Sequence, residues 1–173
     1  HVSKARYMFG GQVTLPMVIR AAAGGGTQKG AQHSHSIESW FVNAPGIRVV
    51  LPSTPYDLKG LLKTAIRSED PVLFIEHEML YNSKGQVPDG EYLLPFGVAD
   101  IKRAGRDVTI VAWSKMVHEA LRAAELLAHE GIEAEVIDVR TLDPLDRDTI
   151  LHSVLRTRRA VVTESTGTRE AAI

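Results

Sequence analysis

The chain has 173 residues, of which 44% are hydrophobic and 24% charged, so it can form a packed core and is too mixed in composition for a disordered or fibrous protein. The 20 Lys and Arg against 21 Asp and Glu leave a formal net charge of −1, which gives no basic field for nucleic acid or anionic lipid. There is no cysteine, which excludes disulfides, thiolate zinc sites and a cysteine nucleophile. No run of the sequence approaches the roughly 20 apolar residues that cross a bilayer, so we expect neither a membrane nor a nucleic-acid partner.

The first half of the chain alternates strand and helix patterns. We expect strands over residues 13–20, 47–52 and 71–76, a glycine-rich loop over 21–30, a short helix capped by Ser36, and a longer helix over 55–67. Ser53 or Thr54 can cap the longer helix. Trp40 and Phe41 are expected to pack in the core. Strand, helix and strand with short joints are typical of a parallel sheet covered by helices.

The apolar periodicity lapses between residues 82 and 96, where Gly and Pro cluster, and we place a linker over residues 84–96. Strands are then expected over 107–113, 133–139 and 160–163, with helices over 115–130 and 146–155. The prediction is an α/β chain with a first domain over residues 1–83 and an incomplete second domain over 97–173. The start at His1 and the short stretch after the last strand lead us to expect a piece of a longer protein.

The most unusual local feature is His33-Ser34-His35, directly after the glycine-rich loop. Two His at i and i+2 of an extended segment point to the same side, and one or two further His, Asp or Glu would complete a metal site. The alternative is that one His packs locally while the other faces solvent. Ser34 lacks the Gly-x-Ser-x-Gly pattern of hydrolases. The glycine run at 24–26 lacks the spacing and the long helix of a phosphate-binding loop.

A second polar cluster, Glu76-His77-Glu78, ends the strand predicted over residues 71–76. Its residue types suit a general base or a metal ligand. Alternation at the end of a strand more simply explains one buried and one exposed side chain. The residues alone therefore assign this cluster no role.

A series of motifs follows in a characteristic order and spacing. They are YMFGG (7–11), PMVIR (16–20), GAQHS (30–34), PGIRVV (45–50), PSTPYD (52–57), EHEMLYN (76–82) and IDVRTLDPLD (137–146). Together they resemble the beta subunit of the thiamine-diphosphate-dependent first component of 2-oxoacid dehydrogenase complexes, of the pyruvate, branched-chain or acetoin type. The resemblance covers nearly the whole chain, and so many ordered matches are more specific than any single motif.

The resemblance implies an α/β fold in which the later part of a transketolase-like pyrimidine-binding domain precedes a transketolase C-terminal-type domain. It implies an alpha2-beta2 heterotetramer with thiamine diphosphate at the alpha/beta interface. The alpha subunit would hold the diphosphate and Mg²⁺, and the beta subunit would receive the aminopyrimidine. Further implied partners are the lipoyl acyltransferase core of the complex and a 2-oxo acid substrate, in a bacterial cytoplasm or an organelle matrix.

By the same resemblance, His33 is the active-site histidine of a Gln-His-Ser motif and contacts the cofactor. Decarboxylation and acyl transfer to a lipoyl group both need a group that exchanges a proton near neutral pH. The glutamate that activates the aminopyrimidine lies upstream of every matched motif and is absent from this chain. His35 stands where the family more often has glutamine, so it either hydrogen-bonds in the same way or adds a second titrating group.

The resemblance also implies a structural potassium site built from backbone carbonyls. Matched by position, its residues are Met17, Ala65, Ile66, Ser68 and Asp70. The end of the helix predicted over 55–67 would present unpaired carbonyls and the negative end of its dipole to a cation. The alternative is an ordinary helix end whose carbonyls bind water.

The function implied is that of part of a beta subunit supporting oxidative decarboxylation of a 2-oxo acid and transfer of the acyl group to a lipoyl domain, inactive without the alpha subunit. One alternative is a non-catalytic, truncated subunit that acts only as an oligomerisation or interaction module. Another is a different thiamine enzyme with the same two domains, such as a transketolase relative. After Glu164 the sequence departs from the Gly-Gly-x-Gly turn and helix of the family, which leaves docking to the acyltransferase core open.

Overall fold

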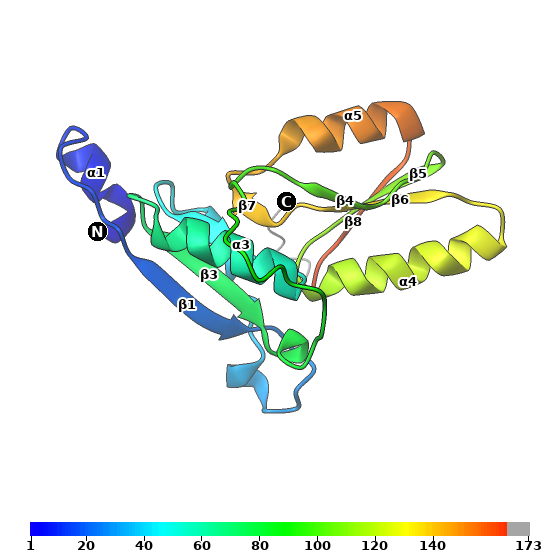
Figure 1. Ribbon diagram of the computed structural model, residues 1–173, viewed down its shortest axis with the longest axis horizontal. Helices are drawn as coiled ribbons and strands as arrows, with labels where there is room; N and C mark the ends of the chain where they lie inside the picture. The colour runs from blue at the N-terminus through cyan, green and yellow to red at the C-terminus, as the bar shows by residue number, and fades with distance from the viewer. Residues whose placement is uncertain (166–173) are drawn as a thin grey trace.

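The first of two sheets combines parallel strands from the first half of the chain with one strand from the second half. The computed structural model of the protein describes residues 1–165, and Figure 1 shows both sheets with their helices. The strand order of the first sheet is β1-β3-β2-β7, from β1 (Val18–Ala23), β3 (Val72–His77), β2 (Arg48–Val50) and β7 (Thr141–Asp143). The first three strands are parallel, and β7 pairs antiparallel with β2.

Strand β1 lies further along the chain than the predicted strand over residues 13–20. It pairs with β3 in a register that runs from Val18 opposite Val72 to Ala23 opposite His77. Pro16, which has no N–H to donate to the ladder, therefore lies before the strand. The alanines assigned to the loop instead continue the strand, and the glycine-rich loop begins at Gly24.

Short helices and one long helix accompany the first sheet. They are η1 (Val2–Lys4), α1 (Ala5–Met8), η2 (Ala31–His33), α2 (Glu38–Val42), α3 (Pro55–Ile66) and η3 (Glu78–Leu80). Helix α3 has Thr54 as its N-cap, and the Thr54 hydroxyl accepts a hydrogen bond from the Asp57 amide at 3.1 Å, as the sequence predicts. Helix α2 follows Ile37, so Ser36 is not its N-cap.

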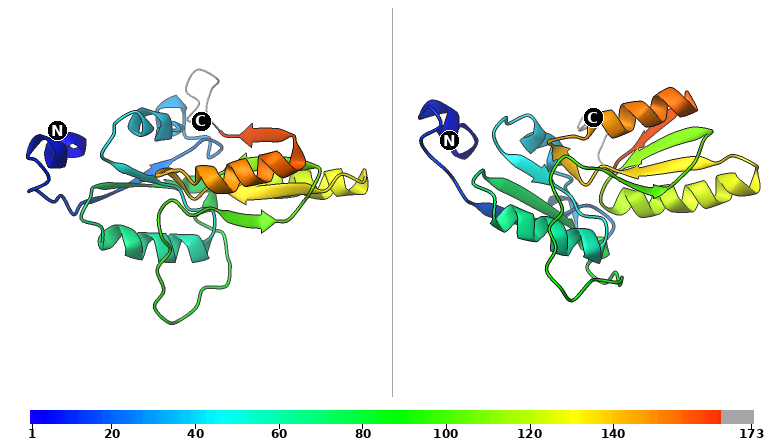
Figure 2. Two further views of the ribbon diagram at one scale, coloured as in Figure 1. Left: turned by 90° about the horizontal axis from the view of Figure 1, so that it is seen from above. Right: turned by 45° about the horizontal axis from the view of Figure 1, so that its top comes forward.

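The second sheet has the order β4-β6-β5-β8, from β4 (Asp100–Arg103), β6 (Ala134–Asp138), β5 (Val108–Ala112) and β8 (Ala160–Thr163). Strand β4 is antiparallel to β6, whereas β5 is parallel to both β6 and β8. Helices α4 (Lys115–His129) and α5 (Arg147–Thr157) lie on opposite faces of this sheet, as Figures 1 and 2 show.

The largest buried cluster joins the two sheets. It includes Leu51 and Ile75 from the ends of β2 and β3, together with Val111, Trp113 and Ile137 from the second half of the chain. These side chains are at most 2% exposed. Trp40 does not join them: its side chain is 57% exposed, so the prediction that it packs in the core is wrong, whereas Phe41 packs partly buried against the cluster.

Residues 84–96, all of which the structure describes, form neither helix nor strand. The segment lies along α3. The Tyr92 ring stacks on Tyr56 at 4.6 Å between centroids. The Thr64 hydroxyl donates to the Leu94 carbonyl at 2.7 Å. A Cβ on Gly60 would lie 2.6 Å from Leu94 Cγ, so a glycine inside the helix gives the segment room to approach.

In the described part of the chain, no helix has the length and apolar character needed to cross a membrane. The sequence differs from the family pattern after Glu164, and residues 166–173 of this stretch lie outside the described residues.

Candidate active site

The loop over residues 24–36 leaves the carboxyl end of β1 and carries His33. Its first turn requires glycine at position 24 for two reasons. The φ of Gly24 is +90°, in the region that favours glycine, and a Cβ at this position would lie 2.3 Å from Nε2 of the His77 ring. The Gly24 amide donates to the His35 carbonyl at 2.8 Å, which closes the loop at its base. The loop therefore returns to the end of the sheet, where ligands of parallel α/β proteins commonly bind.

His33 ends the η2 turn and is exposed. Its amide donates to the Gly30 carbonyl at 3.3 Å, and the Ser34 hydroxyl donates to the same carbonyl at 2.9 Å. The backbone of the turn is thus hydrogen-bonded locally, while the imidazole is accessible from outside the chain.

His35 is also exposed and lies beside another exposed ring. Its imidazole is 5.8 Å from Trp40 between ring centroids, with the planes tilted by 49°. Among residues 1–165 no group of three or more His, Asp or Glu side chains is arranged to hold a metal ion. The structure thus supplies no further ligand for the metal hypothesis based on His33 and His35.

Glu78, the first residue of η3, faces the loop. Its carboxylate accepts a hydrogen bond from Lys29 Nζ at 2.7 Å, and only 14% of the Glu78 side chain is exposed. The hydrogen bond from Lys29 lowers the pKa of Glu78 against the opposing effect of burial, and the charges of Lys29 and His33 lower it further. His33 is therefore within electrostatic reach of the Glu78 carboxylate.

His77 and Glu38 are buried where the two halves of the chain meet. His77 Nδ1 accepts from the Met79 amide at 3.2 Å, and burial together with the charge of Lys115 lowers the pKa of this imidazole. Glu38 accepts from Trp113 Nε1 at 3.4 Å, and burial raises the pKa of its carboxyl group. Both shifts favour the neutral forms. The prediction of one buried and one exposed side chain at 76–78 is wrong, because Glu76 and His77 are both buried and Glu78 is partly buried.

A small pocket of about 200 Å³ lies beside the end of β3. Its wall is formed by residues 52–55 on one side and by Glu76, His77 and Tyr81 on the other. Glu76 is held by Arg20, whose Nε and Nη2 lie 2.5 and 2.8 Å from the two carboxylate oxygens. The two hydrogen bonds fix the orientation of the Glu76 carboxylate in the wall of this pocket.

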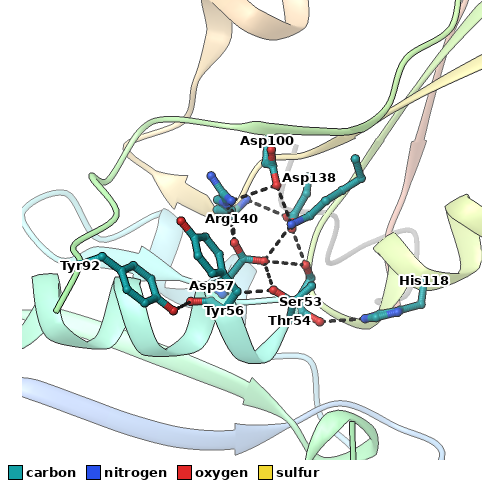
Figure 3. Close-up of polar contacts among 10 residues, drawn as sticks. Ser53, Thr54, Tyr56, Asp57, Tyr92, Asp100, His118, Asp138 and Arg140 are labelled. Atoms are coloured by element: carbon teal, nitrogen blue, oxygen red, sulfur yellow. Dashed lines mark hydrogen bonds and ion pairs between the residues drawn. The ribbon is translucent and has the colours of Figure 1, made fainter. Parts of the chain in front are cut away.

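Behind this wall, Figure 3 shows a cluster of charged side chains between the two halves of the chain. Asp57 comes from α3, Asp100 and Lys102 from β4, Asp138 ends β6, and Arg140 follows it. Lys102 Nζ lies 2.9 Å from Asp57 Oδ2 and 2.7 Å from Asp100 Oδ2. Arg140 Nη2 lies 2.7 Å from Asp57 Oδ1 and 2.9 Å from Asp100 Oδ2. We refer to these five residues as the seam cluster.

The seam cluster is linked to the pocket wall. The Ser53 hydroxyl donates to Asp138 Oδ2 at 2.5 Å, and His118 Nε2 lies 2.8 Å from the Ser53 carbonyl (Figure 3). Burial raises the pKa of Asp138 to about 6, against the effect of Lys102. Burial also acts to raise the pKa of Asp57, but the hydrogen bond from Thr54 and the charges of Lys102 and Arg140 outweigh it and lower that pKa. The sequence alone assigns these residues no role. Asp138 and Arg140 do stand at the end of a buried strand, which is a local signal, but the other three lie inside α3 and β4 and have none.

Of the five residues predicted for a potassium site, Met17, Ala65 and Asp70 have carbonyls that accept hydrogen bonds from within the chain. The Leu15 amide donates to the Glu69 carbonyl at 2.9 Å, and the Val72 amide donates to the Met17 carbonyl at 2.8 Å, which joins the stretch before β1 to the residues between α3 and the start of β3. Within the molecule the Ala65 carbonyl accepts from the Ser68 amide at 3.1 Å, and the Asp70 carbonyl accepts from the Ser68 hydroxyl at 3.0 Å. The potassium site stays a prediction.

Comparison with known proteins gives matches in both halves. Residues 2–84 match the model of the transketolase pyrimidine binding domain, and residues 97–171 match the model of the transketolase C-terminal domain. A solved split-gene transketolase, an inactive beta4 tetramer, is 28% identical with a TM-score of 0.73, covering 94% of this chain and 54% of its own. A transketolase mutant from Pichia stipitis, 16% identical with a TM-score of 0.63 and coverage of 94% and 26%, shares the fold. The predicted fold class is confirmed.

Sequence relatives extend over nearly the whole chain. The acetoin:2,6-dichlorophenolindophenol oxidoreductase subunit beta of Cupriavidus necator is 55% identical over 167 residues, covering 96% of this chain and 49% of the relative. The pyruvate dehydrogenase subunit beta of Bacillus subtilis is 49% identical, with coverage of 94% and 50%. The 2-oxoisovalerate dehydrogenase subunit beta of the same organism is 48% identical, with coverage of 95% and 51%. The chain spans about half the length of the curated relatives it matches. It therefore belongs to the family of chains that join a transketolase pyrimidine binding domain to a transketolase C-terminal domain, and over nearly its whole length it is similar to beta subunits of acetoin, pyruvate and branched-chain 2-oxoacid dehydrogenases.

Proposed function

We propose that this chain is part of the beta subunit of a thiamine-diphosphate-dependent 2-oxoacid dehydrogenase. The reaction is the oxidative decarboxylation of a 2-oxo acid, of pyruvate or branched-chain type, followed by transfer of the acyl group to a lipoyl domain. The observation that carries the proposal is the position of His33: an exposed imidazole at the carboxyl end of β1, on a chain whose sequence relatives are subunits of such dehydrogenases.

The residues present fit one side of a cofactor site. His33 is accessible, and the Gly24 position brings the loop backbone against the end of the sheet. Bound thiamine diphosphate would supply the electron sink for decarboxylation. His33 would hold or deliver a proton at its imidazole. The glycine run at 24–26 leads into the three-residue η2 turn rather than a long helix, so the diphosphate and Mg²⁺ belong to the alpha subunit in this proposal.

The proposed partners are an alpha subunit, in an alpha2-beta2 assembly, and the lipoyl acyltransferase core of the complex. An alpha subunit would cover the open face on which His33 lies and exclude water from it. The proposed location is a bacterial cytoplasm or an organelle matrix; one relative, from Pisum sativum, is a mitochondrial pyruvate dehydrogenase subunit beta that is 49% identical.

We keep the potassium site, at the carbonyls of Met17, Ala65, Ile66, Ser68 and Asp70, as part of the proposal. The hydrogen bonds that hold residues 15–17, before β1, against residues 69–72, which follow α3, support it. If K⁺ binds there, replacing Na⁺ by K⁺ at equal ionic strength raises the thermal midpoint of the chain, by the mass action of a ligand that binds the folded state. Equal midpoints in the two salts would argue for carbonyls that bind water instead.

The test of function uses the complete reading frame that contains this sequence, combined with its cognate alpha subunit, thiamine diphosphate and Mg²⁺. The readout is 2-oxo acid-dependent release of CO₂ and acylation of a lipoyl domain. We expect turnover by the assembly and none by the 173-residue chain alone. We also expect His33→Ala to lower turnover by about 10²- to 10⁴-fold, the range typical of a general acid or base. Turnover by the isolated chain would contradict the proposal that it is incomplete.

A second candidate is a non-catalytic interaction module. It is favoured by the similarity to an inactive beta4 tetramer and by the exposure of Tyr7, Met8 and Phe9, which are 89%, 64% and 58% exposed. The His33→Ala variant separates the two candidates, because loss of turnover with intact assembly supports the catalytic role. Unchanged turnover, with assembly as the remaining property, would favour the module.

A further inference from the structure

The loop that carries His33 has little stiffness of its own. Gly24, Gly26 and Gly30 all have positive φ, and Gln28 adopts a left-handed conformation with a φ of 58°. Glycine-rich backbone loses more conformational freedom on ordering than other sequences do. The position of the imidazole therefore depends on contacts between the loop and its surroundings.

Such contacts follow one short segment at the end of β3. Gly24 lies against His77, and a Cβ on Gly26 would be 3.4 Å from Met79 Cγ. Between them along the sequence, Glu78 pairs with Lys29 at 2.7 Å. Residues 77–79 thus form a platform for the loop, which two glycines approach closely and one ion pair joins.

The ion pair is the part of this platform nearest in sequence to the imidazole. Lys29 lies directly before the Gly30 carbonyl that accepts from His33 and Ser34, so fixing Lys29 fixes the start of the η2 turn. Glu78 is the better-ordered partner, since its side chain is 14% exposed against 57% for Lys29.

We infer that Lys29 and Glu78 are positioning residues for His33: their ion pair holds the glycine-rich loop on the platform and so sets where the imidazole lies. This inference rests on the proposed function for its catalytic consequence, but the ordering of the loop can be measured without catalysis. An ion pair whose cation is exposed, as Lys29 is, contributes little to global stability. Small displacements of a reacting group nevertheless reduce rates strongly.

The test compares Glu78→Gln and Lys29→Met with the exchanged pair Lys29→Glu/Glu78→Lys. In the 173-residue chain, hydrogen exchange of the amides at residues 30–34 is expected to be faster by up to about fivefold in each single variant, with the thermal midpoint nearly unchanged. In the double variant with the charges exchanged, the hydrogen-exchange rates are expected to return to the wild-type values. The conservative variant Lys29→Arg is expected to keep the wild-type rates. Glu91→Gln, which breaks the exposed ion pair with Arg67, is the matched control and should leave the loop unaffected.

In the complete subunit with its alpha partner, each single variant is expected to lower kcat by about threefold to tenfold with little change in KM. Unchanged exchange in the single variants, or a failure of the exchanged pair to restore it, overturns the inference. If loop exchange responds as expected but His33→Ala retains full turnover, the positioning stands and the proposed function fails. If His33→Ala is inactive while both single variants keep full kcat, the inference fails and the function stands.

Discussion

Asp57 connects α3 to two cations from the other half of the chain. Its carboxylate is fully buried and accepts from Arg140 and Lys102. Removing one member of a buried charge cluster leaves its partners uncompensated. We expect Asp57→Asn to lower the free energy of unfolding by about 3–5 kcal/mol in urea titrations, whereas the exposed Asp89→Asn leaves it within about 0.5 kcal/mol. A wild-type midpoint for Asp57→Asn would mean that the seam cluster adds nothing to stability.

Asp138 lies in the same cluster but has the opposite effect on pH dependence. Burial raises its pKa from 3.8 to about 6 in the folded chain, so the folded state binds this proton more tightly than the unfolded state. The contribution of Asp138 to stability is therefore fully present below about pH 4 and is lost as the pH rises to about 6.

The loss amounts to about 3 kcal/mol across that window. It is measured as the difference in the free energy of unfolding between wild type and Asp138→Asn at pH 4 and at pH 7. Asp57, whose pKa is lowered, contributes in the other sense: its stabilisation is lost as the pH falls through its folded pKa. A wild-type minus Asp138→Asn difference that is flat between pH 4 and 7 would contradict the assignment.

At the scale of elements, Gly60 tests the packing of residues 84–96 on α3. Alanine inside a helix is ordinarily favoured over glycine by about 1 kcal/mol. Here its Cβ would lie 2.6 Å from Leu94 and 2.8 Å from Tyr92. We expect Gly60→Ala to destabilise the chain by about 1–3 kcal/mol, as overpacking does.

Gly85→Ala is the matched control, because the nearest atom to its Cβ is Pro55 Cδ at 3.4 Å. Urea titration of both variants decides the matter. Stabilisation by Gly60→Ala would show that the segment moves away freely, as an ordinary linker does.

Elements with strong local patterns could be predicted from the sequence. Helices α3, α4 and α5 repeat apolar residues at helical spacing, and the caps at Thr54 and Asp146 are local signals. Strands β4 and β7 are short, and β4 carries three charged residues among four, so neither shows apolar alternation. They form because neighbouring strands offer them hydrogen bonds, which is tertiary information.

In the candidate site, too, some groups could be predicted from the sequence and others could not. His33 could be identified from the motif around it. The ion pair between Lys29 and Glu78 could not, because the two residues are 49 positions apart and no local pattern indicates that they meet. The seam cluster likewise combines residues more than 80 positions apart. The loop and the polar cluster at 76–78 can both be recognised in the sequence, but nothing local indicates that they meet.

At the scale of the molecule, the shared core predicts a single unfolding transition. Ile137 is fully buried in a cluster that also contains Leu51 and Ile75 from the other sheet. We expect far-UV circular dichroism and tryptophan fluorescence to give coincident urea midpoints. Ile137→Ala should lower the free energy of unfolding by about 2–5 kcal/mol, and the urea midpoints from the two probes should fall together. Separate transitions for the two probes would show that the halves unfold independently.

Strand β7 has a topological consequence. It belongs to the second half by sequence but supplies the edge of the first sheet next to β2. A break in the polypeptide between residues 84 and 96 would therefore not release two self-sufficient fragments. The upstream fragment would expose unpaired backbone N–H and C=O groups along β2. An edge strand with unpaired groups tends to pair with a strand from another molecule. Nicking this protein should thus promote strand-swapped association rather than clean separation into pieces.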